Sequence, residues 1–202
     1  MKDAMHTKYW LLLLVCCTLS SCMYGSAAVT GAQVVYDRHN LSRKIDNNYT
    51  TLKAYRAIYL YREDFQNTHV SISIDDDAVL LTGQTPYLHQ KTEIENMIKV
   101  LVNNREIYNY VEIASPVSFL TKTSDAWITT KIKTEFIASN QIDPTKIKVI
   151  TENGTVFLRG IVPKEQAEIA IEVAKSTSGV QKIVPLFSYL VIERDSKTVE
   201  II

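Results

Sequence analysis

Cysteine and histidine are scarce in this 202-residue sequence. The three cysteines, Cys16, Cys17 and Cys22, all fall near the start, so the rest of the chain can form neither a disulfide nor a cysteine-ligated metal site. No histidines stand at the spacing of metal ligands, and the Ser, His and Asp residues present lie outside any catalytic motif. We therefore expect no metal, no cofactor and no enzymatic activity.

Long apolar runs and an excess of charge of one sign are also missing. The apolar run over residues 10–19 is about half the roughly 20 residues that a membrane-spanning helix needs. Lysine and arginine total 22, and aspartate and glutamate also total 22. This balance argues against nucleic acid as a partner.

The first residues are typical of an export signal. Lys2 and Lys8 precede or flank the apolar run and small residues follow it, which predicts a signal peptide over residues 1–21. The segment Leu19-Ser20-Ser21-Cys22 resembles a bacterial lipobox. That resemblance implies that Cys22 is acylated, with two or three chains because one chain binds only marginally. The alternative is an ordinary signal peptide with a chance cysteine. Residues 22–45 are predicted to be a tether.

The rest of the chain contains an internal repeat. Residues 70–86 align without a gap with residues 147–163, so that each residue is matched 77 positions later. Four aligned positions are identical: Val79/Val156, Leu81/Leu158, Gly83/Gly160 and Pro86/Pro163. Because this period is too long for a solenoid repeat, it indicates two copies of one small domain.

The second copy predicts how each domain folds. Ser124 or Asp125 suits the N-cap of a helix. An apolar stripe at i, i+4 and i+8 follows, formed by Ile128, Ile132 and Phe136. Two short strands flank Asn153-Gly154, which suits a type I′ hairpin turn. A helix between Pro163 and Gly179 and a strand over residues 180–191 complete the order α-β-β-α-β.

We therefore expect an α+β fold of two tandem αββαβ sandwiches, each with a three-stranded mixed sheet and two helices on one face. The first helix of the first copy is predicted over residues 49–61. Gly83 and Gly160 are expected to let the backbone and a helix approach closely. The expected boundaries are 46–115 for the first domain, 116–123 for a linker, 124–192 for the second domain and 193–202 for a flexible tail.

This pattern, with a glycine closing the second strand and Gly-Val after the second helix, resembles the BON-domain family. Its most specific segments are residues 125–131 and 148–160, and the first copy is the weaker match because Asn103 stands where the second has Gly179. Two copies behind a lipobox look like the dual BON-domain lipoproteins of the Gram-negative outer membrane. The resemblance implies a lipid-anchored protein that faces the periplasm, binds anionic phospholipids such as phosphatidylglycerol or cardiolipin, and helps to maintain envelope integrity.

Trp127 is the leading candidate for membrane contact. On a helical wheel it lies about 140° from the apolar stripe, beside Lys131. An indole at headgroup depth and an ammonium near phosphate suit an anionic lipid surface. The expected phospholipid-binding residues are Trp127, Thr130, Lys131, Lys133 and Thr134. The alternative is that Trp127 packs against the first domain.

Charge favours the second domain as the lipid-binding one. Residues 125–192 contain eight basic and seven acidic side chains, whereas residues 46–115 contain six and ten. Some tyrosines of the first helix are expected in the core and some against the neighbouring domain: Tyr49, Tyr55, Tyr59 and Tyr61. The alternative function is a periplasmic scaffold or adaptor that recognises an envelope protein or peptidoglycan.

Overall fold

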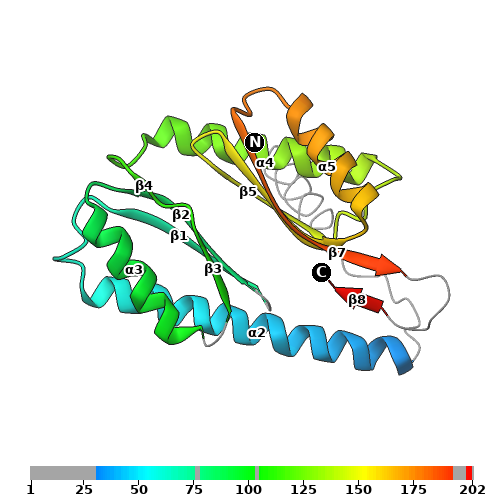
Figure 1. Ribbon diagram of the computed structural model, residues 1–202, viewed down its shortest axis with the longest axis horizontal. Helices are drawn as coiled ribbons and strands as arrows, with labels where there is room; N and C mark the ends of the chain where they lie inside the picture. The colour runs from blue at the N-terminus through cyan, green and yellow to red at the C-terminus, as the bar shows by residue number, and fades with distance from the viewer. Residues whose placement is uncertain (1–30, 76–77, 103–104, 193–198, 202) are drawn as a thin grey trace, which may run out of the picture. The chain divides into compact units, whose positions relative to one another are not determined.

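The computed structural model describes residues 31–75, 78–102, 105–192 and 199–201 (Figure 1). The chain has the expected α+β class, with two mixed β-sheets. Residues 45–202 form one compact unit. The predicted signal peptide, Cys22 and Asn103 lie outside the described residues.

Helix α2, Gly31–Leu60, begins well before the predicted start at Tyr49. Much of the segment predicted to be a tether, residues 22–45, is therefore helical. The helix contains no proline, and its single glycine is its first residue, so the backbone favours a helix throughout. Apolar periodicity is weak before Ile45, which is why a pattern argument misses this part.

The first sheet contains four strands rather than the predicted three: β1 His69–Ile74, β2 Ala78–Thr85, β3 Glu106–Asn109 and β4 Glu112–Ile113. β1 is antiparallel to β2, and both β3 and β4 run parallel to β2. The predicted last strand divides because Asn109 turns the chain: its Oδ1 accepts a hydrogen bond from the backbone N–H of Val111 at 3.1 Å.

The second sheet has the strand order β5-β6-β7-β8, so the three-stranded prediction is wrong here too. The additional strand β8, Val199–Ile201, pairs with β7 and lies in the segment predicted to be a flexible tail. The other elements are α4 Phe119–Ala138, β5 Ile147–Glu152, β6 Thr155–Val162, α5 Lys164–Ser176 and β7 Lys182–Ile192. The type I′ turn is confirmed, since φ is 48° at Asn153 and 72° at Gly154.

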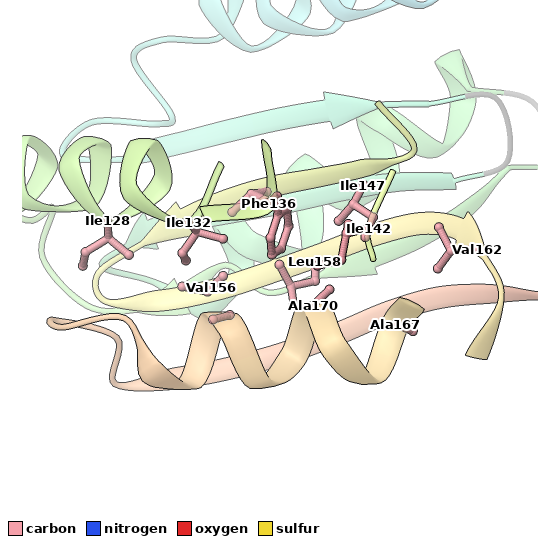
Figure 2. Packing of buried hydrophobic residues seen from close by; sticks show 12 residues of the cluster. Ile128, Ile132, Phe136, Ile142, Ile147, Val156, Leu158, Val162, Ala167 and Ala170 are labelled. Carbon is pink, nitrogen blue, oxygen red and sulfur yellow. The ribbon is translucent and has the colours of Figure 1, made fainter. Parts of the chain in front are cut away.

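Each sheet carries a hydrophobic core under its helices. In the second sheet, Ile128, Ile132 and Phe136 of α4 are at most 1% exposed and pack with strand residues such as Leu158 (Figure 2). Helix α5 completes this core with small side chains, Ala167, Ala170 and Ala174. Helices α2 and α3, Leu88–Leu101, cover the first sheet in the same way, through Ala54, Ile94 and Ile98.

The opposite faces of the two sheets contact each other. Leu80 on β2 packs with Phe157 on β6 and Val184 on β7. The ring of Tyr110 meets the ring of Phe157 edge to face, with centroids 5.1 Å apart. The central parts of strands β2 and β6 are therefore buried on both faces, which explains the apolar runs over residues 78–81 and 156–158.

Arg159 is a buried cation at this contact between the sheets. Its guanidinium lies 3.1 Å from the carboxylate of Asp75 and donates to the backbone carbonyl of Ala78 at 3.3 Å. Lys148 reaches the same carboxylate at 3.0 Å but is far more exposed, at 44% against 6% for the side chain of Arg159. Because Arg159 is removed from water, its charge depends on these partners.

Replacing Arg159 by alanine is expected to lower the free energy of unfolding by about 2 kcal/mol. Breaking a buried ion pair costs about 3–5 kcal/mol, and the lower value reflects Asp75, which is one-third exposed and therefore screened. Urea unfolding measures the change. Lys148→Ala is the matched control and should change stability by less than about 0.5 kcal/mol. Equal effects of the two changes would contradict the role given to burial.

Candidate membrane-binding site

Helix α4 begins earlier than predicted, within residues 116–123, which were expected to be a linker. Ser118 is its N-cap, and its Oγ accepts a hydrogen bond from the backbone N–H of Thr121 at 3.2 Å. The prediction of Ser124 or Asp125 as the N-cap is wrong. Both are good capping residues by type, but the chain is already helical when it reaches them.

Asp125 instead holds the hairpin turn between β5 and β6. Its carboxylate accepts hydrogen bonds from the backbone N–H groups of Asn153 and Gly154, both at 2.8 Å. The residue is 6% exposed. This bond pair fixes α4 to the turn and thereby sets which face of α4 points outward.

Trp127 lies on the outward face of α4 and is 54% exposed. The Nζ atom of Lys131 lies 5.2 Å from the centroid of its ring, which is cation–π geometry. At 100° per residue, Thr130 and Thr134 lie within about 60° of Trp127 around the helix, but Lys133 lies about 120° away. The structure therefore brings together four of the five predicted residues and leaves Lys133 on another face.

Three large apolar residues on this outward face were not predicted. Phe119, Leu120 and Ile137 are 81%, 79% and 71% exposed. Each lies within about 80° of Trp127 around α4. The helical period could have identified Leu120, because it lies seven residues, or two helical turns, before Trp127. The prediction that residues 116–123 form a linker placed Leu120 outside the helix. We call Phe119, Leu120, Trp127 and Ile137 the α4 stripe.

The threonines between these residues satisfy their hydroxyl groups inside the helix. Thr123, Thr130 and Thr134 each donate to the carbonyl four residues earlier, at distances of 3.0, 2.8 and 2.9 Å. Such bonds leave no hydroxyl donor unpaired if the face enters an apolar layer. The face is thus less polar than its sequence suggests.

The two structural glycines mark close contacts between strands, not between a strand and a helix as expected. A Cβ atom on Gly83 would lie 2.1 Å from the backbone oxygen of His69, and one on Gly160 would lie 2.1 Å from that of Lys146. His69 is the first residue of the adjacent strand β1, and Lys146 immediately precedes the adjacent strand β5. Glycine is required there because a side chain would collide with backbone.

Asp143 is a polar residue away from this face, and its hydrogen bonds have a structural role. The pKa of Asp143 lies below its usual range, because the side chain and backbone of Thr145 donate hydrogen bonds to its carboxylate. This stabilises the turn before β5.

A cleft of about 330 Å³ between the sheets is lined by charges of both signs, including Lys91, Lys182 and Glu112. A lining with charges of both signs does not indicate one chemical class of ligand.

Helices in the described part of the chain are too short or too polar to cross a lipid bilayer. The lipidation of Cys22 lies outside the described residues and stays a prediction.

Comparison with known proteins identifies the family. The BON-domain model matches residues 124–190. The outer membrane lipoprotein DolP of Haemophilus influenzae is 31% identical over 166 residues, which cover 82% of this chain and 86% of the relative. The 21 kDa hemolysin of Actinobacillus pleuropneumoniae is 33% identical over 138 residues, 67% of this chain and 71% of the relative. The osmotically-inducible protein Y of Escherichia coli is 23% identical over 159 residues, 76% and 77% of the two chains. The chain therefore belongs to the BON-domain family.

Proposed function

We propose that this chain is a lipoprotein of the outer membrane, anchored through Cys22 and facing the periplasm, that helps to maintain envelope integrity. Its two repeats are tandem BON domains, and the second binds anionic phospholipids such as phosphatidylglycerol or cardiolipin through helix α4. The relationship to outer membrane lipoprotein DolP supports the location. The protein acts by binding and not by catalysis.

The α4 stripe is the observation that carries this proposal. A fully buried Leu or Phe side chain gains about 1.5–3 kcal/mol over an exposed one. Phe119 and Leu120 are largely exposed, so partial entry into the headgroup layer would release much of this energy. Lys131, held over the ring of Trp127, would meet lipid phosphate at the same depth.

Removing the apolar end of the stripe should weaken membrane binding. We expect the double variant Phe119→Ser/Leu120→Ser to reduce the affinity of residues 23–202 for phosphatidylglycerol vesicles at least tenfold, which corresponds to about 1.4 kcal/mol. Trp127→Ala should reduce it severalfold. Vesicle co-sedimentation measures both changes.

The matched control is Leu88→Ser/Val100→Ser on α3, where the side chains are similarly exposed at 68% and 82%. This control should bind as the parent chain does. If both double variants bind equally, or if phosphatidylcholine vesicles bind as well as anionic ones, the lipid proposal fails. The scaffold alternative would then be favoured by recovery of one defined envelope protein whose binding depends on α4.

A further inference from the structure

Helix α2 carries a second exposed apolar stripe. Ile45, Tyr49, Leu52 and Tyr59 are 60%, 56%, 66% and 64% exposed. With Arg56, they follow one another at intervals of four, three, four and three residues, which places them within about 80° on one face of the helix. We call these five residues the α2 stripe. The prediction that the tyrosines divide between the core and the neighbouring domain does not hold for Tyr49, Tyr59 and Tyr61, which are all more than half exposed.

The opposite face of α2 is fixed to the first sheet. Ala54 is completely buried in the core of this sheet, and Ile58 packs against the same cluster. The hydroxyl of Tyr55 accepts a hydrogen bond from the backbone N–H of Ile72 on edge strand β1, at 2.8 Å. These contacts hold the α2 stripe outward.

Cations accompany the aromatic rings of this face. The Nζ atom of Lys53 lies 4.3 Å from the ring centroid of Tyr49. The guanidinium of Arg62 lies 5.3 Å from the ring of Tyr59 and donates to its hydroxyl at 2.9 Å. The same unit, an exposed ring with a cation above it, is formed by Trp127 and Lys131 on α4. Rings with one wet polar end and adjacent cations suit a lipid headgroup layer.

Helix α2 is positively charged near the α2 stripe, although the first repeat as a whole carries a net negative charge. Between residues 42 and 60, four side chains are basic and one, Asp46, is acidic. Asp46 lies 3.6 Å from Arg105, which offsets its charge. Elsewhere, Asp75 is engaged by Lys148 and Arg159 at the contact between the sheets. The exposed face of α2 is therefore positive in a repeat that is acidic overall.

We propose that the α2 stripe is a second membrane contact, which binds anionic phospholipid independently of α4. The proposal rests on the proposed function only in requiring that the protein work at a bilayer. A helix pair with a second copy of the chain fits less well. Arg56 lies in the middle of the stripe, where a packed pair would bury its guanidinium, whereas a membrane offers it phosphate.

The position of α2 in the chain also favours the membrane. Gly31 is nine positions after Cys22 in the sequence, and a fully extended chain of that length spans at most about 32 Å. The helix rises about 21 Å more before Ile45. An acyl group on Cys22 would therefore keep the α2 stripe within reach of the same bilayer. A second contact strengthens binding because the anchor raises its effective concentration at the surface.

A fluorescent probe on α2 tests this proposal directly. The chain from Met23 onward contains no cysteine, so Leu52→Cys can be labelled alone with an environment-sensitive dye, with Val100→Cys on α3 as the control. On phosphatidylglycerol vesicles the emission from position 52 should shift to the blue, and that from position 100 should not. Lys53→Gln/Arg56→Gln should weaken vesicle binding about tenfold, and Lys164→Gln/Lys175→Gln on α5 should leave it unchanged.

The outcomes separate the two membrane contacts, because Trp127 is the only tryptophan after Met23 and reports on α4. If Trp127 fluorescence responds to vesicles and the dye at position 52 does not, the α2 proposal fails and the proposed function stands. If neither responds, both fail. A dye shift that grows with protein concentration in the absence of vesicles, or one equally strong on phosphatidylcholine, would also overturn the α2 proposal.

Discussion

Replacing Gly83 by alanine is expected to destabilise the first repeat by about 3 kcal/mol or more. The new Cβ atom would lie 2.1 Å from the backbone oxygen of His69 in the paired strand, and no side-chain rotation can relieve that contact. The φ angle of 115° adds strain, since a residue with a side chain rarely adopts it. Overpacking alone typically costs about 1–3 kcal/mol. Urea unfolding of the chain from Met23 onward measures the loss.

Gly154→Ala is the matched control for this prediction. Gly154 also has a positive φ, 72°, but its new Cβ atom would meet the flexible side chain of Gln181 at 2.9 Å and not backbone. We expect a loss of about 1–2 kcal/mol, the usual penalty for this conformation. A loss as large as that of Gly83→Ala would show that φ, and not the strand contact, explains the glycine. Gly160, which makes the same contact in the second repeat, should resemble Gly83.

Replacing Asp125 by alanine is expected to destabilise the second repeat by about 3 kcal/mol. The carboxylate is nearly buried and accepts two hydrogen bonds from the backbone of the β5–β6 turn. A hydrogen bond to a charged group contributes about 1.5–3 kcal/mol, and the turn N–H groups would lose their acceptor. Because Trp127 is near Asp125 and is the only tryptophan after Met23, its fluorescence follows the unfolding of this repeat.

An exposed carboxylate provides the comparison for Asp125. Asp143 also accepts hydrogen bonds within a turn, from Thr145, but it is solvated, and Asp143→Ala should cost less than about 1 kcal/mol. Asp125→Asn keeps one carbonyl acceptor and should restore about half of the stability lost in Asp125→Ala. If Asp125→Ala unfolds at the same urea concentration as the parent chain, the hydrogen bonds between Asp125 and the turn do not contribute to the stability of the protein.

Local patterns predicted the parts of the fold that depend on neighbouring residues. The apolar stripe of α4, Ile128, Ile132 and Phe136, is buried as predicted, because helical spacing alone places these side chains on one face. The turn at Asn153-Gly154 is equally local. The start of α4 was missed because Phe119 and Leu120 face outward, and exposed apolar residues in a short connecting segment do not stand out as helical.

Contacts between distant residues explain most of the remaining differences. The residue type of Asp125 predicts a helix cap, yet its hydrogen-bond partners lie 28 and 29 residues later in the chain. The strand break at Asn109 depends on one side-chain hydrogen bond, and β8 depends on a partner strand. The 77-residue spacing between the two copies of the repeat also does not predict which faces of the two copies contact each other.

The amino-acid sequence by itself determined the class, the repeat and the lipobox-like start, because composition, spacing and short motifs carry these properties. It also placed Trp127 away from the core of its own helix. Only the tertiary structure decided that Trp127 stays exposed, that Arg159 is buried between the sheets, and that α2 presents a positive apolar face. Burial and charge at a surface depend on which elements pack together, and packing brings together residues that no local pattern relates.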